Sequence, residues 1–445
     1  MSIFKAGYGK CEITPSIGCF MQGNPTRRQV ESIHDPLYAR CVAFENEGLA
    51  VLMYFDVCGI PQNVCDPMRQ FVAESLGCEA KDVFIAATHT HTGPNINNGM
   101  FPKDEAYLDS LKHFAARAAR TAVNDLHPAQ MYFNSDVLPD MTFVRRFRMK
   151  DGSVLTNPGA GNPDILCPMT EADDTIRLLK ITREGAGDIV LVNFQCHADV
   201  VKKINDQFAI SADYPGAVCK VLEGALPGAD CIYCNGCAGD LVQGNQMVVS
   251  DWNTRCWEHA EHMGRTIGGK ILSMYSKAKP IQAGPVRTIE KRIDIPLKVP
   301  TEEELVRSRQ VVEDYDAGKF VLRKKAPGVM LDITKLYEAK TLLGLAKNAV
   351  TPNVCVSAFC VGEFAAAGIP GEPFCEIGKR IRAGGHFPAQ FSLGLTNGSQ
   401  GYYPMQDAFE VQGYEARTSK FQAGVGELLA DTALELLRIL AEYNR

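Results

Sequence analysis

Short apolar runs alternate with longer segments of helical periodicity along nearly the whole chain, and this alternation limits the folds that are possible. Runs of about 4–8 apolar residues bounded by turn-forming residues are typical of buried strands. The expected strands lie at Leu49–Phe55, Val83–Ala87, Ile189–Phe194, Val354–Ile369 and Phe391–Leu395. Helix-compatible spacing covers Gln62–Leu76, Glu105–Leu126, Asp251–Tyr275, Pro373–Ala383 and Phe421–Tyr443. The pattern predicts an α/β fold with a mixed, largely parallel sheet flanked by helices.

A charged, helical segment at about residues 300–348 differs in character from the rest of the chain. It opens with Thr301 followed by Glu304, the capping box that marks the start of a helix. We expect a helical excursion here that forms a lid, an interface or a solvated hairpin. Residues 1–445 are otherwise predicted to be a single catalytic domain, with no C-terminal sandwich domain.

Composition and charge exclude several classes of function. A net charge of −6 and a pI near 5.9 provide no basic field for nucleic acid. No apolar run approaches the ~18 residues of a membrane-spanning helix, and the N-terminus lacks the pattern of a secretory signal. The sixteen cysteines are irregularly spaced, which is typical of free thiols in a reducing compartment. We predict a cytoplasmic protein that acts on a small-molecule or lipid-like substrate, and leave open a homo-oligomer.

Residues that suit metal binding follow four of the expected strands. His89 and His91 stand just after one strand, and His197, Glu372 and Tyr402 follow three others. In open α/β sheets, ligands bind at the carboxyl ends of the strands, so these side chains are expected to meet at one rim. Two histidines and one carboxylate are the ligands of many hydrolytic zinc sites. The sequence therefore predicts a metal site at the carboxyl ends of the strands.

Each of these residues also has a purely structural interpretation. A histidine such as His197 is often a core residue with its hydrogen bonds satisfied inside the fold. Glu372 suits the positive end of the helix expected to follow it, and Tyr402 suits plain packing. Their shared position after strands is what favours the metal site.

A second motif, Cys231, Cys234 and Cys237, has the C-x2-C-x2-C spacing of some iron–sulfur and zinc sites. Its first half is apolar and strand-like, and no clear fourth cysteine ligand lies nearby. We therefore interpret these cysteines as structural.

Several stretches occur in a colinear order that is distinctive in combination. They are GYGKCEITP, ATHTHTGPN, NFQCHADVV, CNGCAGD, IPGEPFCEIG and GYYPMQDAFEVQGYEA, between about residues 7 and 430. Together they resemble the catalytic domain of the neutral (alkaline, non-lysosomal) ceramidase family, and in particular a short, intracellular, bacterial-type relative.

The resemblance implies a zinc-dependent hydrolase that cleaves an amide bond by attack of a metal-bound water, with one zinc ion per chain. The family's zinc ligands fall on His89, His197, Glu372 and Tyr402. The groups that line the scissile amide fall on His91, Arg145 and Tyr414.

Two details of the site that the resemblance implies are not decided by the sequence. Val144 stands where the family has an asparagine before its arginine, so Arg146 is an alternative to Arg145. Asp56, Asp213 and Asp240 also lie near strand ends, where we expect them either to orient the ligating histidines or to act as caps and turns.

The sequence does not identify the substrate. A lipid needs a long apolar groove and a way to approach a membrane, and no amphipathic stretch is clearly suited to that. The alternatives are a metallohydrolase of a smaller polar ester, lactone, acylated sugar or acylated amino acid, and a non-catalytic metal-binding relative.

Overall fold

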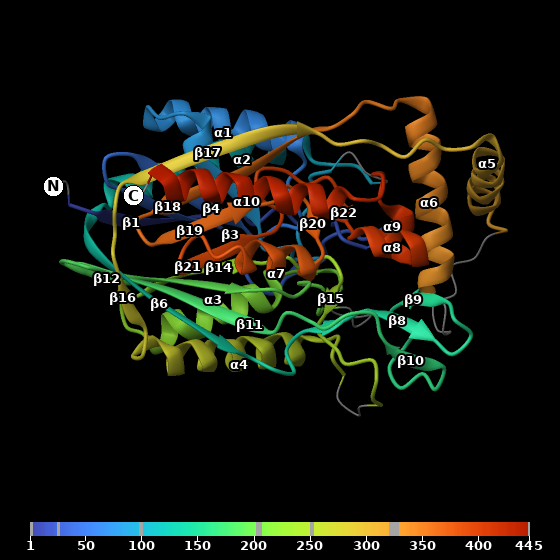
Figure 1. The fold of residues 1–445 in the computed structure, drawn as a ribbon, viewed down its shortest axis with the longest axis horizontal. Coiled ribbons are helices and arrows are strands. Elements are labelled where there is room, and N and C mark those ends of the chain that lie inside the picture. Colours follow the sequence, from blue (N-terminus) through green and yellow to red (C-terminus); the bar gives the residue numbers. More distant parts are fainter. Residues whose placement is uncertain are drawn as a thin grey trace.

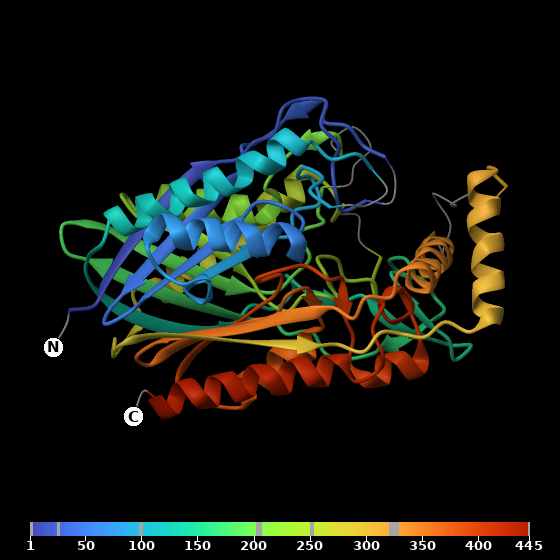
Figure 2. The ribbon, with the colours of Figure 1, turned by 90° about the horizontal axis from the view of Figure 1, so that it is seen from above.

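The computed structural model describes residues 3–24, 27–97, 101–201, 207–249, 253–319 and 329–443. The fold has four layers, with helices outside and two stacked β-sheets inside (Figures 1 and 2). One sheet has nine strands and the other has four. The α/β class and the mixed sheet flanked by helices, both expected from the sequence, are confirmed.

Three consecutive units with the same order of elements build these layers. Each unit has three antiparallel strands, a helix, a fourth strand parallel to the third, and a closing helix. The first unit contains β1 (Lys5–Glu12), β3 (Tyr38–Glu45), β4 (Leu49–Phe55), α1 (Gln62–Leu76), β5 (Val83–Ala87) and α2 (Glu105–Asn124). The second contains β6 (His127–Val137), β11 (Thr175–Arg183), β12 (Ala186–Phe194), α3 (Asp213–Ala225), β14 (Asp230–Asn235) and α4 (Trp257–Tyr275). The third contains β17 (Val286–Asp294), β18 (Asn353–Val361), β19 (Phe364–Gly368), α7 (Cys375–Ala383), β21 (Ala389–Leu393) and α10 (Val425–Tyr443).

The first two units share the nine-stranded sheet, joined where β1 pairs with β6 through Lys5↔Pro128 and Ala6↔His127. The third unit forms the four-stranded sheet. The remaining elements are β2 (Ser32–Ile33), η1 (Ala80–Asp82), β7 (Phe143–Val144), β8 (Arg146–Met149), β9 (Val154–Thr156), β10 (Ile165–Pro168), β13 (Ala209–Ile210), β15 (Leu241–Val242), β16 (Lys279–Ile281), α5 (Glu302–Asp316), α6 (Val329–Lys347), β20 (Glu372–Pro373), β22 (Tyr402–Tyr403), α8 (Gln406–Val411) and α9 (Tyr414–Thr418).

The expectation of a largely parallel sheet is wrong. Within the units, only the third and fourth strands pair in parallel, as β4–β5, β12–β14 and β19–β21. The second and third strands are joined by very short turns at residues 46–48, 184–185 and 362–363, and such turns can join only antiparallel strands. The third turn also divides the expected strand Val354–Ile369 into β18 and β19.

Most expected helices differ from the structure only at their ends. The first part of the helix expected at Asp251–Tyr275 falls partly outside the described residues, and α4 begins at Trp257. The last helix begins at Val425 because Phe421 is held extended by a β-bridge to Leu297.

Aromatic side chains fill the space between the two sheets. Phe359 from the smaller sheet lies 5.6 Å from Phe44 and 4.8 Å from Phe84 of the larger sheet, measured between ring centroids. On the outer faces, α1 and α2 cover the first unit, α3 and α4 cover the second, and α7 and α10 cover the third. Each sheet is therefore covered on both faces.

Each unit also carries a long insertion between its first and second strands. The insertions span residues 13–37, 138–174 and 295–352, and the last contains α5 and α6. Because these insertions follow the carboxyl ends of the first strands, they lie at the end of the molecule where the third and fourth strands also finish (Figure 1). Polar loops from all three units therefore meet at this end.

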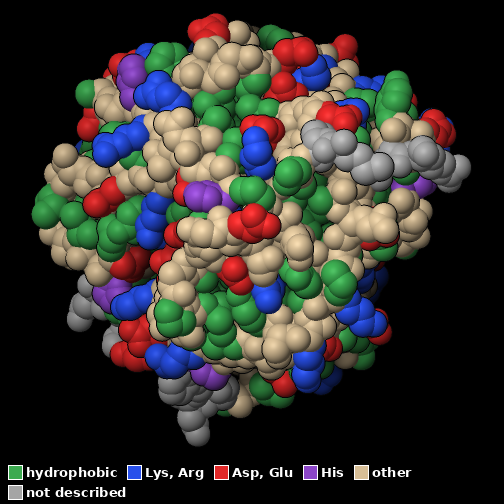
Figure 3. Space-filling view, turned by 90° about the vertical axis from the view of Figure 1, so that its left-hand side faces the viewer, with side chains coloured by type: hydrophobic (Ala, Val, Ile, Leu, Met, Phe, Trp, Pro, Cys, Tyr) green, Lys and Arg blue, Asp and Glu red, His purple; other side chains and the backbone are tan. Residues whose placement is uncertain are grey.

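The opposite end, where both termini lie, has acidic and basic side chains interspersed with hydrophobic ones (Figure 3). Among the helices of the described residues, none has the length and apolar character needed to cross a bilayer.

Replacing Phe359 by alanine is expected to lower the free energy of unfolding by about 3–5 kcal/mol, because the cavity would open between the two sheets. Urea unfolding followed by circular dichroism measures this loss. Val137→Ala is the control, since Val137 is 50% exposed and its truncation should change stability by at most about 0.5 kcal/mol. Equal losses in the two variants would contradict the assigned core.

Candidate metal centre

Three side chains from the three units converge at the loop-rich end. His89 follows β5, His197 follows β12, and Glu372 follows β19. The Nε2 atoms of both histidines lie 3.4 Å from the same carboxylate oxygen, Glu372 Oε2. The ligand atoms of the three residues all lie within 4.8 Å of one another, which is compatible with a single shared metal ion.

Backbone carbonyls orient the two imidazoles. His89 Nδ1 lies 2.5 Å from the Cys58 carbonyl oxygen, and His197 Nδ1 lies 2.8 Å from the Ala238 carbonyl oxygen. Because a carbonyl can only accept, each Nδ1 donates its proton to the carbonyl, and each Nε2 is the ring nitrogen directed at the centre. His89 also has a left-handed backbone with φ of 72°, which turns its side chain away from the strand direction.

The electrostatics of the cluster favour a bound cation. Burial, together with Arg145 and His89, lowers the pKa of His197 to about 4, so its imidazole is neutral at neutral pH. Burial opposes ionisation of Glu372, but the adjacent His89 and His197 outweigh it and hold its pKa well below the usual value. Glu372 Oε2 is buried and has no hydrogen-bond partner among the described residues. A buried carboxylate oxygen in that state is costly unless a cation compensates it, so the residues present fit a metal ion.

A second trio, Cys58, His89 and His91, is also close enough to hold an ion. In this trio Cys58 Sγ faces His89 Nδ1 at 3.8 Å. That nitrogen already donates to the Cys58 carbonyl, so it offers no lone pair on this side. The trio with Glu372 is therefore the better metal site.

The ATHTH loop is fixed by its threonines. Thr90 and Thr92 both donate to the Ser211 carbonyl, at 2.7 and 3.0 Å. His91 Nε2 lies 3.3 Å from His89 Nε2, so the second histidine borders the cluster. Gly23 packs directly on the His91 ring, because a Cβ built on Gly23 would lie 2.5 Å from His91 Cγ.

Tyr402 enters the cluster through the short parallel pair β20–β22, in which it stands opposite Glu372. Its ring centroid lies 6.5 Å from that of His197 and 5.6 Å from that of Tyr414. Burial and the Glu372 charge raise the pKa of Tyr402 well above its usual value. Its hydroxyl is therefore protonated unless a cation replaces that proton.

Arg145, and not Arg146, faces the cluster. Arg145 Nη1 lies 3.3 Å from His197 Nε2, and its Cζ lies 5.3 Å from the Tyr402 ring centroid. Arg146 instead lies over the ring of Phe374, at 5.0 Å. The sequence left this choice open, and the structure resolves it.

A fully buried carboxylate that no sequence pattern indicated, Glu415, holds Arg145 in place. Glu415 Oε1 accepts from Arg145 Nε at 2.7 Å, and Glu415 Oε2 accepts from Thr156 Oγ1 at 2.8 Å. Arg145 Nη2 also donates to the Gly239 carbonyl at 2.6 Å. The only available signal was the position of Glu415 directly after Tyr414 in the GYEA stretch.

The expectation that three aspartates orient the histidines is wrong, and their alternative role as caps and turns is the one observed. Asp56 accepts from the Tyr38 backbone and from Arg40. Asp213 accepts from backbone nitrogens around the start of α3, and Asp240 accepts from the Cys375 nitrogen. All three fix backbone near the site, while carbonyls orient the imidazoles.

The C-x2-C-x2-C motif is structural, as expected. Cys231 and Cys234 point to opposite faces of β14, one toward α3 and α4 and the other into the layer between the sheets. All sixteen cysteines are free thiols.

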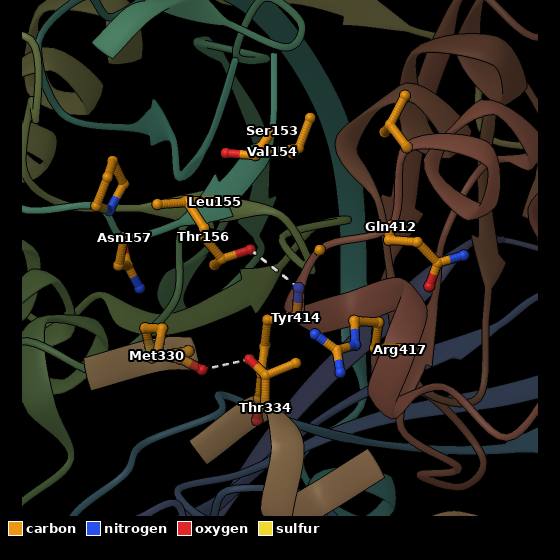
Figure 4. Close-up of a pocket in the computed structure, with 13 residues that line it drawn as sticks. Ser153, Val154, Leu155, Thr156, Asn157, Met330, Thr334, Gln412, Tyr414 and Arg417 are labelled. Carbon is orange, nitrogen blue, oxygen red and sulfur yellow. Dashed lines mark hydrogen bonds between the residues drawn. The ribbon is translucent and has the colours of Figure 1, made fainter. Parts of the chain in front are cut away.

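Three cavities adjoin the cluster, and Tyr414 lines all of them. The first, of about 310 Å³, contains His89, His91 and Glu372. The second, of about 490 Å³, lies along α6 and shares Tyr337 and Tyr402 with the first. The third, of about 300 Å³, is drawn in Figure 4, where the Tyr414 backbone nitrogen donates to Thr156 Oγ1 at 3.3 Å.

Solved structures with the same fold include neutral ceramidase from Pseudomonas aeruginosa. The match has a TM-score of 0.75 and 16% identity, and covers 100% of this chain and 75% of that one. A ceramidase complexed with C2 matches with a TM-score of 0.74 and 16% identity, covering 100% of this chain and 76% of that one. No family model and no curated protein matches the chain by sequence. The chain therefore has the neutral ceramidase fold, and the resemblance read from its sequence is confirmed at that level.

His197→Ala is expected to abolish binding of one divalent metal ion per chain, because it removes one imidazole and leaves the Glu372 carboxylate with a single histidine. Isothermal titration of zinc into chelator-treated protein measures the binding. His259→Ala is the control, since His259 is a buried histidine on α4 with 5% exposure. Retention of stoichiometric tight binding by the His197 variant would contradict the site.

Proposed function

We propose that this chain is a zinc-dependent hydrolase related to neutral ceramidases, which cleaves an amide bond. The observation that carries the proposal is the trio of His89 Nε2, His197 Nε2 and Glu372 Oε2, set within a neutral ceramidase fold. Tyr402 would be the fourth ligand. The sixteen free thiols support the further proposal of a cytoplasmic location.

Zinc held by these residues would supply a Lewis acid and lower the pKa of a water molecule toward ~7. Imidazole nitrogen and carboxylate oxygen are ordinary zinc ligands, and the carbonyls of Cys58 and Ala238 fix the two rings for that role.

The other residues act on the substrate. In the proposed reaction, Arg145 and Tyr414 would donate hydrogen bonds to the amide oxygen as negative charge develops on it. Burial raises the pKa of Tyr414, which keeps its hydroxyl protonated as a donor. Tyr402 and Glu415 raise the pKa of Arg145 despite its burial, so the guanidinium stays charged. His91 would deliver a proton to the departing nitrogen.

A second candidate is hydrolysis of a smaller polar ester, lactone, acylated sugar or acylated amino acid by the same residues. The lining of the metal cavity favours it, because it includes four residues with side-chain amides: Gln22, Asn24, Asn95 and Asn97. The third candidate, a non-catalytic relative, is less favoured because none of the seven residues that the resemblance implies is missing from the sequence.

The test measures metal content and turnover on the same purified sample. A panel of short-chain fluorogenic ceramide, N-acyl amino acids, acetylated sugars and simple esters would be compared for wild type and His197→Ala. About one zinc per chain, with amide turnover lost in the variant, would support the proposal. Zinc with ester turnover alone would favour the second candidate, and zinc with no turnover of any substrate would argue for the third.

Gly23→Ala is expected to reduce kcat by at least ~10-fold, because the added methyl displaces the His91 ring from the cluster. Gly18→Ala is a matched control, since both glycines have left-handed backbones, with φ of 92° and 91°, and Gly18 has no atom within 4 Å of an added Cβ. Both variants should lose similar stability, by about 1 kcal/mol. Equal kcat values in the two variants would show that His91 is not held by this contact.

A further inference from the structure

We propose that the substrate is an N-acyl amino acid, whose carboxylate is bound in the α6-side cavity by Lys420. This inference rests on the proposed amide hydrolysis and adds the chemical class of the substrate. In the reaction, water adds hydroxyl to the acyl carbon and a proton to the nitrogen, and the C–N bond breaks to release a fatty or short-chain acid and a free amino acid.

The cavity is placed to hold one end of a substrate whose amide lies at the metal cluster. Its volume of about 490 Å³ is in the range of small-molecule sites. Tyr337, Tyr402 and Tyr414 line both this cavity and the one that contains His89 and Glu372. A molecule extending past these three rings would therefore reach from the cluster into the α6 side.

The charged residues among those that line this cavity are lysines. Lys340 comes from α6 and Lys420 follows α9, and the described lining contains no aspartate or glutamate. The rest of the wall is neutral, with hydroxyls of Thr341, Thr418 and Ser419 that donate to backbone carbonyls. An anionic group fits this wall better than a neutral or cationic one.

Lys420 is held in a fixed position by a chain of amides. Its Nζ donates to Gln400 Oε1 at 2.6 Å, and Gln400 Nε2 donates to Gln62 Oε1 at 2.8 Å. The ammonium also lies 5.3 Å from the Phe421 ring centroid. These partners are neutral, so no carboxylate among them compensates the charge of Lys420, and burial lowers its pKa.

Arg417, the neighbouring cation, differs from Lys420 in having an acidic partner. Arg417, which lines the third cavity, is paired through two nitrogens with the carboxylate of Glu338 on α6. Lys420 has no such partner among the described residues, so its positive charge is available to a bound anion. A buried or partly buried cation with only neutral partners gains the most from an anionic ligand.

The activity test uses a pair of substrates that differ only in charge, N-hexanoylglycine and N-hexanoylglycinamide. For wild type, kcat/KM is expected to be on the order of tenfold higher for the carboxylate, the usual effect of one charged hydrogen bond. Lys420→Gln should remove this preference, and the loss should appear in KM for the carboxylate substrate. Lys279→Gln, an exposed lysine on β16, is the control and should keep the preference.

A binding test separates failure of this inference from failure of the proposed hydrolysis. It measures N-hexanoylglycine and its amide by calorimetry on His89→Ala, which lacks a cluster ligand, and on His89→Ala/Lys420→Gln. The carboxylate site is supported if His89→Ala binds N-hexanoylglycine more tightly than its amide and the double variant loses this difference. If the wild type then cleaves neither compound, only the proposed hydrolysis fails. Equal binding of the two compounds, or no effect of Lys420→Gln on binding, overturns the carboxylate site. If the wild type nevertheless cleaves both compounds, the proposed hydrolysis remains supported.

Discussion

The parallel pairing of the third and fourth strands in each unit is the constraint on which the site depends. A parallel pair requires a crossover, here by α1, α3 and α7, and it makes both strands end on the same side. Because this arrangement occurs three times, the carboxyl ends of six strands, here called exits, lie at one end of the molecule. His89, His197 and Glu372 occupy one exit in each unit, so residues more than a hundred positions apart meet without any long loop crossing the core.

Charge compensation explains why the cluster holds together inside a buried site. Glu415 is a buried carboxylate, Glu372 is a partly exposed carboxylate whose Oε2 atom is buried, and Arg145 is a buried cation between the cluster and Glu415. Because Arg145 pairs with Glu415, a different cation is needed to compensate the negative charge of Glu372. Cys58 and Glu372 raise the pKa of His89 despite its burial, so His89 supplies that cation in part, and a divalent metal ion would supply it completely. Stability and metal binding are therefore linked through one network.

The sequence was sufficient for the elements and for the site residues that follow strands, because apolar runs and their polar exits are local patterns. It failed where the information is long-range. Nothing local shows that Gly23 packs on His91, or that Glu415 pairs with Arg145 across 270 positions. Strand direction was also misjudged, since apolar runs look alike in parallel and antiparallel sheets. The turn at residues 362–363 was missed because apolar residues continue on both sides of it.

The insertion at residues 295–352 leaves the sheet from β17 and returns to the adjacent strand β18. Its two ends are fixed side by side whatever lies between them, and doubling the length of such a loop costs only about 0.6 kcal/mol. The same holds for the insertions of the other two units. The walls around the cluster can thus be lengthened, shortened or exchanged while His89, His197 and Glu372 stay in register. A scaffold of this kind can therefore vary the surroundings of the cluster without moving the cluster itself.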